Sequence, residues 1–196
     1  MSRQVLPLRR LDGAPPEMSD EALVAACAVG ESAALGALFD RHYEAVRRFL
    51  ARMSGTDDRD LDDLVQVTFE TVPRAARSFD GRAGVRTWLM GIANNVARHH
   101  VRAEVARKRL ARSVAALPMP SSTDAHGEIL DRERAARLHA AVLALPDKIR
   151  EAFVLVYLEG VPGKEVADLL AVGEGTIWKR LFQARALLKC AMEKAR

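Results

Sequence analysis

The chain has 196 residues, of which 49% are hydrophobic, 29% charged and only 5% aromatic. This balance excludes wholesale disorder, and the abundance of Ala, Leu and Arg favours helices over a β-rich fold. The two cysteines form no C-x-x-C pair, and no apolar run approaches the ~18 residues of a membrane span. We therefore expect a cytoplasmic protein with no cofactor, no zinc site and no membrane insertion, whose net charge of +4 permits a polyanionic partner.

The N-terminal part of the chain predicts a leader followed by two helices. Residues 1–18 contain three prolines and no apolar core, which predicts a flexible leader and no signal peptide. Ser19 and the two acids after it are typical of a helix start, because a hydroxyl caps the first turn and carboxylates favour its positive end. Gly30 then separates this helix from a second one, predicted over about 31–53.

Two more helices and a linker follow. Asp60 is predicted to open a third helix, which Pro73 should kink or end because proline lacks the backbone N–H. A loop over 79–84 precedes a fourth helix, predicted from about Val85 to about Arg112. The proline- and serine-rich stretch around 113–127 is typical of a linker.

The last third of the chain has the layout of a helix-turn-helix. A helix over 146–159 ends at Gly160, a short helix spans about 163–170, and a long helix starts near Glu174 after the turn 171–173. In this motif the second helix of the pair enters the major groove of DNA. The predicted fold class is therefore all-α: two small helical domains joined by a flexible linker, the C-terminal one a helix-turn-helix. The predicted boundaries are 1–18 for the leader, 19–112 for the first domain, 113–127 for the linker and 128–196 for the second domain.

Charge separates sharply between two segments of the first domain. Residues 57–70 hold six carboxylates against one arginine, a net charge of −5. Residues 81–112 hold eight basic side chains against one glutamate, a net charge of +7. Two surfaces of opposite sign suggest two different partners.

The long C-terminal helix carries the candidate DNA contacts. Its apolar positions, such as Ile177, face the preceding helix, where Ala167 is small enough for close approach. Its outward positions offer side chains of the kinds that contact phosphates and base edges: Thr176, Trp178, Lys179, Arg180 and Gln183. Short patterns of this kind also arise by chance, so a helical hairpin with a solvated basic face stays an alternative.

These segments resemble the two conserved domains of bacterial RNA polymerase sigma factors of the extracytoplasmic-function group. The second domain resembles the part that recognises the promoter −35 element, through residues 145–146, 150–153, 157–160, 165–167, 175–177 and 184–185. The first domain resembles the polymerase-docking and −10-recognising part, through residues 60–66, Phe69, 87–93 and Asn95. The two sets occur in the family's order. The resemblance implies an alternative sigma factor, which is not an enzyme, since the polymerase performs the chemistry.

For the acidic helix, the resemblance implies docking on the β′ clamp helices of core RNA polymerase. The implied docking residues are Asp62, Asp63, Gln66 and Phe69. Polar residues recur every four positions from Asp62, so they share one helix face. The ordinary meaning of such a stripe is a solvated surface, which is the alternative here.

For the loop over 79–84 and the basic helix, the resemblance implies binding of the single-stranded −10 element. The implied residues are Phe79, Arg82, Trp88, Asn95, Arg98 and Arg102. Capture of a flipped base needs an apolar pocket, polar groups for the base edge and a positive track for phosphates. Trp88 is flanked by Leu89 and Ile92, so a place in the core is an alternative for it.

The resemblance also implies partners, and the sequence departs from the family in places. The implied partners are core RNA polymerase through its β′ clamp helices and β flap, promoter DNA, and an anti-sigma factor. Trp178 and Gln183 stand where the family commonly has basic residues, so the preferred promoter cannot be copied from a relative. His99 and His100 are adjacent and point to different helix faces, which argues against a metal pair. A helix-turn-helix regulator that acts without core polymerase, and an adaptor that binds no DNA, are the competing functions.

Overall fold

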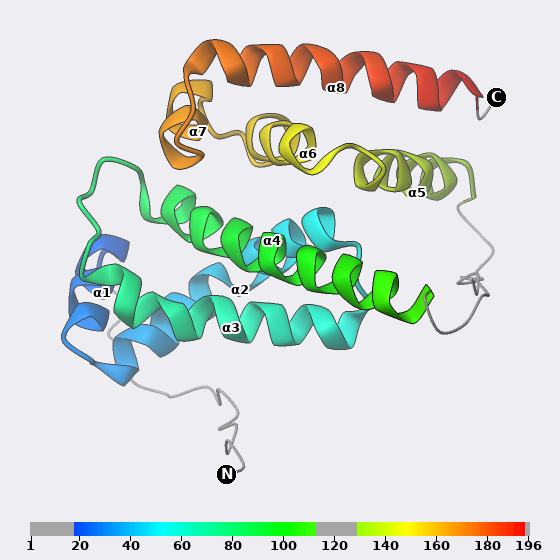
Figure 1. Cartoon of the computed structure of the whole chain (residues 1–196). Coiled ribbons are helices and arrows are strands. Elements are labelled where there is room, and N and C mark those ends of the chain that lie inside the picture. The colour runs from blue at the N-terminus through cyan, green and yellow to red at the C-terminus, as the bar shows by residue number, and fades with distance from the viewer. Residues whose placement is uncertain (1–17, 113–128, 195–196) are drawn as a thin grey trace. The chain divides into compact units, whose positions relative to one another are not determined.

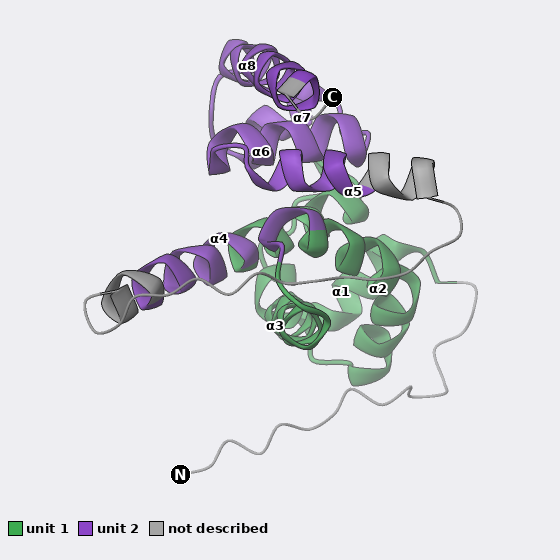
Figure 2. Ribbon diagram, turned by 90° about the vertical axis from the view of Figure 1, so that its right-hand side faces the viewer, with its two compact units in different colours: residues 1–51, 56–96 green, residues 52–55, 97–196 purple. Residues whose placement is uncertain are grey.

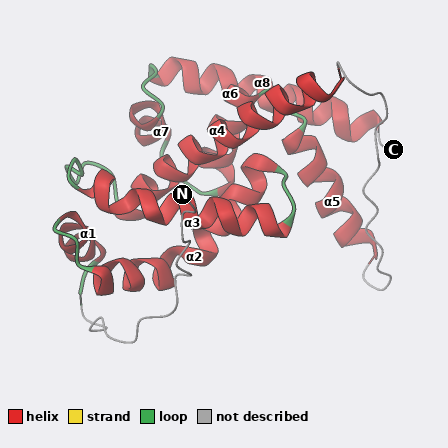
Figure 3. Ribbon diagram, turned by 60° about the horizontal axis from the view of Figure 1, so that its bottom comes forward, coloured by secondary structure: helices red, strands yellow, loops and turns green. Residues whose placement is uncertain are grey.

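The computed structural model describes residues 18–112 and 129–194 (Figure 1). All regular elements within these ranges are helices (Figure 3), which confirms the all-α prediction. No helix in these ranges is long and apolar enough to cross a membrane. The chain divides into two compact units (Figure 2), one of residues 1–51 and 56–96 and one of residues 52–55 and 97–196. The predicted linker and all of the predicted leader except Met18 lie outside the described residues.

The first unit is built from the first four helices. They are α1 (Asp20–Ala28), α2 (Ser32–Ser54), α3 (Asp58–Ala76) and α4 (Val85–Arg112), of which the last residues of α2 and the second half of α4 are grouped with the second unit. Helix α1 packs against α3. The core consists of aliphatic and aromatic side chains that recur at helical spacing: Leu23, Leu38, Val46, Phe49, Leu50, Leu61, Val65, Phe69, Val72, Leu89 and Met90.

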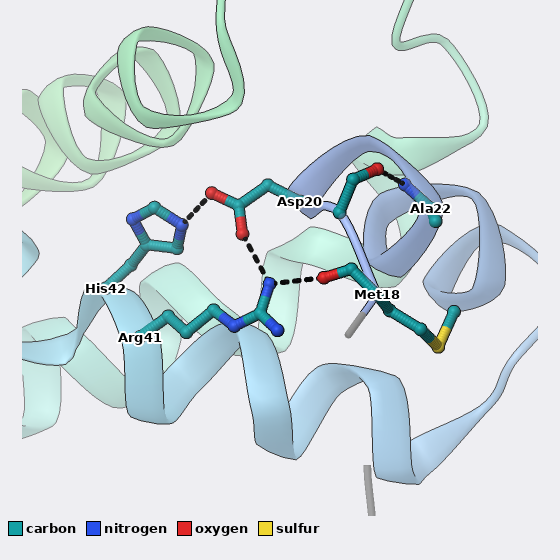
Figure 4. A network of polar contacts seen from close by, with 6 residues as sticks. Met18, Asp20, Ala22, Arg41 and His42 are labelled. Carbon is teal, nitrogen blue, oxygen red and sulfur yellow. Dashed lines mark hydrogen bonds and ion pairs between the residues drawn. The ribbon is translucent and has the colours of Figure 1, made fainter. Parts of the chain in front are cut away.

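Polar contacts fix the start of α1 to the middle of α2 (Figure 4). The Asp20 carboxylate accepts a hydrogen bond from Arg41 at 2.9 Å and lies 2.7 Å from Nε2 of His42, which is buried. Arg41 also donates to the Met18 carbonyl at 2.6 Å. Partial burial by itself raises the pKa of Asp20, but the hydrogen bonds and charges of Arg41 and His42 outweigh this and lower it. The carboxylate is therefore held in its charged form at this junction.

The helix starts follow from side-chain caps, with one correction. Ser19 Oγ accepts the N–H of Ala22 at 3.2 Å, as the sequence predicts for α1. The prediction that Asp60 opens the third helix is wrong by two residues. Asp57 caps α3, accepting the N–H of Asp60 at 3.0 Å, so the helix begins at Asp58. Several acids in a row make each a candidate cap, and only the backbone geometry decides among them.

Pro73 does not end α3, so that part of the prediction is wrong. The helix continues through Pro73 to Ala76. Proline at this position removes one backbone hydrogen bond near the end of the helix, while its fixed φ is compatible with helical backbone. Buried Phe69, Val72 and Ala76 hold this last part of the helix in the core, which offsets the lost bond.

The second unit contains the helix-turn-helix. Its elements are α5 (Ile129–Leu143), α6 (Asp147–Phe153), the π-helical turn η1 (Val154–Leu158), α7 (Gly163–Leu169) and α8 (Glu174–Lys194). Helix α8 packs against α5, α6 and α7. The sequence predicts one helix over 146–159, whereas the structure passes from α6 into η1 before Gly160 ends it with φ +71°. Periodicity does not distinguish one wider turn from α-helix.

The two cysteines differ in their surroundings. Cys27 lies in the core, 1% exposed, and burial raises the pKa of its thiol. Cys190 lies near the end of α8 and is exposed. Both are free thiols.

Candidate functional site

The acidic face of α3 is the first candidate surface. Asp62 and Asp63 are exposed, and Gln66 is half-buried one turn later. The Gln66 amide donates to Glu70 at 2.9 Å, so the polar groups of this stripe are linked along the helix. Together with Glu70 these residues form one polar face, defined here as the α3 acidic face.

Helix α2 contacts the α3 acidic face through Arg47 and Tyr43. Arg47 donates to Asp58 at 2.7 Å and to Asp62 at 3.4 Å, and these hydrogen bonds raise the pKa of the Arg47 guanidinium. The Tyr43 hydroxyl also donates to Asp62 at 3.4 Å. Burial raises the pKa of Tyr43, and the charge of Asp62 adds to the effect. Asp62 is thus held in place from the side of α2 while its carboxylate stays exposed.

Phe69 stands apart from the other predicted docking residues. It is fully buried, and its ring packs edge-on against Phe39 of α2 at a centroid distance of 4.8 Å. The side chain therefore supports α3 from inside the unit, and its surface is not exposed to a partner. Its apolar neighbours on the sequence, Leu64, Val65 and Val72, share this buried side.

The loop before α4 and the first turns of that helix form the second candidate surface. The ring of Phe79 lies 5.0 Å from that of Trp88, and both side chains are half-buried. Asp80 accepts the N–H of Arg82 at 3.1 Å and also pairs with its guanidinium at 3.2 Å, while Gly81 has φ +72°. The tight turn leaves the Arg82 side chain 90% exposed beside an aromatic pair. Trp88 is thus neither fully in the core nor free on the surface.

Predicted residues on α4 share one face of the helix. Trp88, Asn95 and Arg102 are spaced seven residues apart, which places them in one line along an α-helix, with Arg98 close beside it. Asn95 and Arg102 are exposed and Arg98 is half-buried. This line, defined here as the α4 stripe, combines an aromatic ring, an amide that both donates and accepts, and cationic groups.

The helix-turn-helix is the third candidate surface. Helix α7 is followed by a turn in which Ala171 has φ +51° and the N–H of Val172 donates to the Ala167 carbonyl at 2.9 Å. Buried Val166, Ala167 and Ile177 hold α7 against α8. The structure therefore confirms the predicted pairing of a short helix with a long one.

The candidate side chains of α8 differ in how much they are exposed. Thr176, Trp178, Lys179 and Gln183 are exposed, whereas Arg180 is half-buried. Burial raises the pKa of Glu151 in α6, and the charge of Arg98, followed by that of Arg180, opposes this rise. Arg180 therefore lies near a buried carboxylate of its own unit, whereas Lys179 is exposed to solvent.

Three residues belong to these surfaces in addition to those predicted from the sequence. Arg47 is one, because its link to Asp62 joins two helices and leaves no periodic signal. Phe182 is another: it is 74% exposed, one turn after Trp178. In the sequence, Phe182 does not fall on the buried stripe of Ile177 and Leu181, and this mismatch could have predicted that its ring is exposed. The third is Arg185, which stacks over the ring of Tyr157 at 5.0 Å and donates to its hydroxyl.

The chain matches two family models, in the order of its two units. Residues 38–107 match the model described as Sigma-70 region 2, and residues 135–188 match the model described as Sigma-70, region 4. The first match contains the α3 acidic face and the α4 stripe, and the second contains the helix-turn-helix. Among the residues that the structure describes, no group of His, Cys, Asp and Glu could hold a metal ion.

Similar proteins and structures point the same way. The ECF RNA polymerase sigma factor SigM of Mycobacterium tuberculosis is 32% identical, over 90% of this chain and 86% of that protein. The RNA polymerase sigma factor CnrH of Cupriavidus metallidurans is 31% identical, over 91% and 96%. A structure of CnrH in complex with the cytosolic domain of CnrY has a TM-score of 0.65 at 27% identity, covering 90% of this chain and 99% of that one.

Proposed function

Because the chain belongs to the extracytoplasmic-function group of RNA polymerase sigma factors, we propose that it directs transcription initiation through three surfaces. The α3 acidic face docks on core RNA polymerase. The loop over 79–84 and the α4 stripe hold the single-stranded −10 element. Helix α8 recognises the −35 element in duplex DNA. The observation that carries the proposal is that one chain presents an acidic docking helix, a basic helix and a helix-turn-helix in the family's order.

The proposal divides the chain into functional domains of residues 19–112 and 128–196. The two family matches, over 38–107 and 135–188, support this division. The domains act by recognition, and the polymerase carries out the chemistry, so the protein is not itself an enzyme and needs no cofactor. It works where RNA polymerase does, in the cytoplasm.

Docking through the α3 acidic face is supported by charge and exposure. Asp62 and Asp63 present carboxylates to solvent, and Arg47 and Tyr43 restrain the first of them. We expect this face to contact the β′ clamp helices of the polymerase, and the β flap is the second expected contact of the chain with core polymerase. Phe69 contributes by holding α3 in position from the core.

Binding of the −10 strand is supported by the composition of the α4 stripe. Single-stranded DNA is bound by aromatic surfaces together with a positive groove that follows the backbone. The Phe79–Trp88 pair supplies the aromatic surface, Asn95 supplies hydrogen bonds for a base edge, and Arg102 supplies exposed charge. Arg82, which is 90% exposed, extends the positive region at one side, while the guanidinium of Arg98 pairs with Glu151 of α6 at 3.2 Å.

The first experiment mixes the purified chain with sigma-free core polymerase and a library of promoter fragments. Specific initiation is expected, and Asp63→Asn should weaken core binding about tenfold, which corresponds to one lost charged contact. Glu44→Gln is the control, since it removes one exposed carboxylate of α2, outside the segment 60–66 that carries the docking resemblance. Equal losses for the two variants would contradict docking through this face.

A second experiment separates the two DNA surfaces. Arg102→Ala should reduce the slope of log affinity for a −10 single strand against log salt by about 0.7, the value for one phosphate contact on single-stranded DNA. Arg48→Ala, an exposed arginine of α2, should leave that slope unchanged. Lys179→Ala should weaken −35 duplex binding and leave −10 binding intact.

The competing function, a helix-turn-helix regulator that acts without core polymerase, is not favoured. It leaves the match to Sigma-70 region 2 and the α3 acidic face without a role. Specific duplex binding without any complex with core would support that regulator and overturn the proposal.

We also propose that an anti-sigma factor controls this protein. The similar CnrH structure is a complex with the cytosolic domain of CnrY, and a sigma factor from Bartonella quintana with the same fold is in complex with the anti-sigma factor NepR. Such a partner would compete with core polymerase. Its candidates can be tested by whether they block formation of the complex between this chain and core.

A further inference from the structure

Two exposed aromatic rings lie one turn apart on α8. Trp178 is 53% exposed and Phe182 is 74% exposed. A spacing of four residues places both on the same side of the helix, beside the buried line of Ile177 and Leu181. We call this pair the α8 aromatic strip. Large apolar side chains exposed together mark a contact surface far more often than single ones do.

Contacts inside the unit hold the Trp178 ring in place. Its indole N–H faces Glu174, with a hydrogen bond of 3.3 Å to the carboxylate. A Cβ built on Gly163, the first residue of α7, would lie 3.4 Å from Cζ2 of the ring, so the indole packs directly over the start of α7. Since its only donor is already engaged, the surface that Trp178 offers to a partner is apolar carbon.

The surroundings of the α8 aromatic strip favour DNA as the occupant. Exposed Lys179 and Gln183 adjoin it on the same helix. These cationic and amide groups suit phosphates and base edges. Within the major groove, the C5 methyl group of thymine is the base feature that an apolar side chain contacts favourably.

We propose that Trp178 and Phe182 together recognise thymine methyl groups in the −35 duplex. This rests on the proposed recognition of the −35 element by α8 and goes further, because it names the chemical feature that is recognised. Thr176, Lys179 and Gln183 then supply polar and phosphate contacts, while the aromatic strip makes the element depend on thymine at one position or more. The α8 aromatic strip is thus a specificity determinant.

The test uses the holoenzyme and a promoter duplex with a randomised −35 window upstream of a fixed −10 element. Selection for binding gives the preferred −35 sequence, and each thymine in it is then replaced by deoxyuridine, which removes only the methyl group. We expect at least one replacement to weaken binding about fourfold, the effect of losing one buried methyl group. The readout is the affinity for the duplex with thymine divided by the affinity for the duplex with deoxyuridine at the same position.

Variants then assign the methyl contact to the strip. Trp178→Ala or Phe182→Ala should bring the thymine-to-deoxyuridine ratio close to one. Leu187→Ala is the matched control, because Leu187 is an exposed apolar residue of α8 at 45% exposure that lies off the strip. A ratio of two affinities for one protein sample is unaffected by partial unfolding, since that lowers both affinities equally.

Three outcomes would overturn the inference. A preferred −35 sequence without thymine, or deoxyuridine that binds as well as thymine, would remove the methyl contact while leaving −35 recognition intact. Variants of the strip that weaken binding to core polymerase and not to DNA would assign the surface to a protein partner. Failure of the holoenzyme to select any −35 sequence would instead contradict the proposed function itself.

Discussion

Arg47 on α2 and Asp58 on α3 form an ion pair of 2.7 Å that joins the middle of one helix to the first turn of the next. The same guanidinium reaches Asp62 at 3.4 Å, so a single cation neutralises part of a strongly acidic segment. Without it, the six carboxylates of residues 57–70 would repel one another more strongly. The contact is exposed on the Asp58 side, where 89% of the side chain is accessible, and salt should therefore screen it.

Arg47→Ala should lower the melting temperature at low ionic strength and have little effect in 1 M salt. Screening shortens the reach of charges to about 3 Å at that concentration, so the lost attraction no longer matters. Thermal unfolding followed by circular dichroism at both salt concentrations measures the difference. Arg48→Ala, which removes an exposed arginine next to it, is the control. A deficit for Arg47→Ala that persists in high salt would show a packing role for its side chain.

Phe69→Ala should destabilise the first unit by about 3–5 kcal/mol, the usual cost of removing a fully buried phenylalanine. The substitution leaves a cavity against Phe39, whose ring packs on Phe69 at 4.8 Å. Urea unfolding of the full chain measures the loss. Val67→Ala, on the exposed side of the same helix, should change the free energy of unfolding by no more than about 0.5 kcal/mol. Similar effects for the two would mean that Phe69 is not part of the core.

The contact between Asp20 and the Arg41–His42 pair should make stability depend on pH in the acid range. The pKa of Asp20 is lowered from its ordinary value of 3.8, so folding favours the charged carboxylate. A group of this kind stabilises the fold above its ordinary pKa, and this contribution is lost as the pH falls through the folded pKa. The stability difference between the wild type and Asp20→Asn should shrink as the pH falls below about 4. Denaturant titrations at several pH values measure it, and a difference that does not vary with pH would contradict the expectation.

Alanine at Gly160, before α7, and at Gly163, the first residue of α7, should change the free energy of unfolding in opposite directions. Gly160 has φ +71°, where a Cβ is strained, so Gly160→Ala should cost about 1–2 kcal/mol. Gly163 has ordinary helical backbone, and a Cβ there only touches the Trp178 ring at 3.4 Å. Gly163→Ala should therefore stabilise the fold by about 0.4–1 kcal/mol by restricting the unfolded chain. Urea unfolding measures both changes. If both substitutions stabilised the fold, or both destabilised it, this account would be contradicted.

The sequence predicted most of the fold because its helices are strongly periodic and bounded by distinct residues. Ser19, Gly30 and Gly160 end or begin helices where expected, and the turn before Glu174 separates α7 from α8. In each case a cap or a positive φ leaves a local signal in the residue type. The all-α class and the helix-turn-helix pairing followed from these signals.

The structure differs from the sequence predictions at places where tertiary packing determines the conformation. Pro73 is carried through α3 by the buried residues beside it, and η1 differs from α-helix by one wider turn. The burial of Phe69 and the link from Arg47 to Asp62 depend on which helix lies opposite, which periodicity within one helix does not specify. The docking and DNA roles of individual residues came from family resemblance and stay predictions until the variants above are measured.

The thiol of Cys27 is buried and that of Cys190 is exposed, and this difference is useful for following the assembly of the chain with polymerase and promoter. Maleimide dyes react with an accessible thiolate, and Cys27 is both buried and raised in pKa, so the reaction should be confined to Cys190. The native chain can therefore be labelled at one position without any substitution, at the opposite end of α8 from Trp178. A fluorophore at that position would report in real time when the second unit loses its rotational freedom on joining polymerase and promoter.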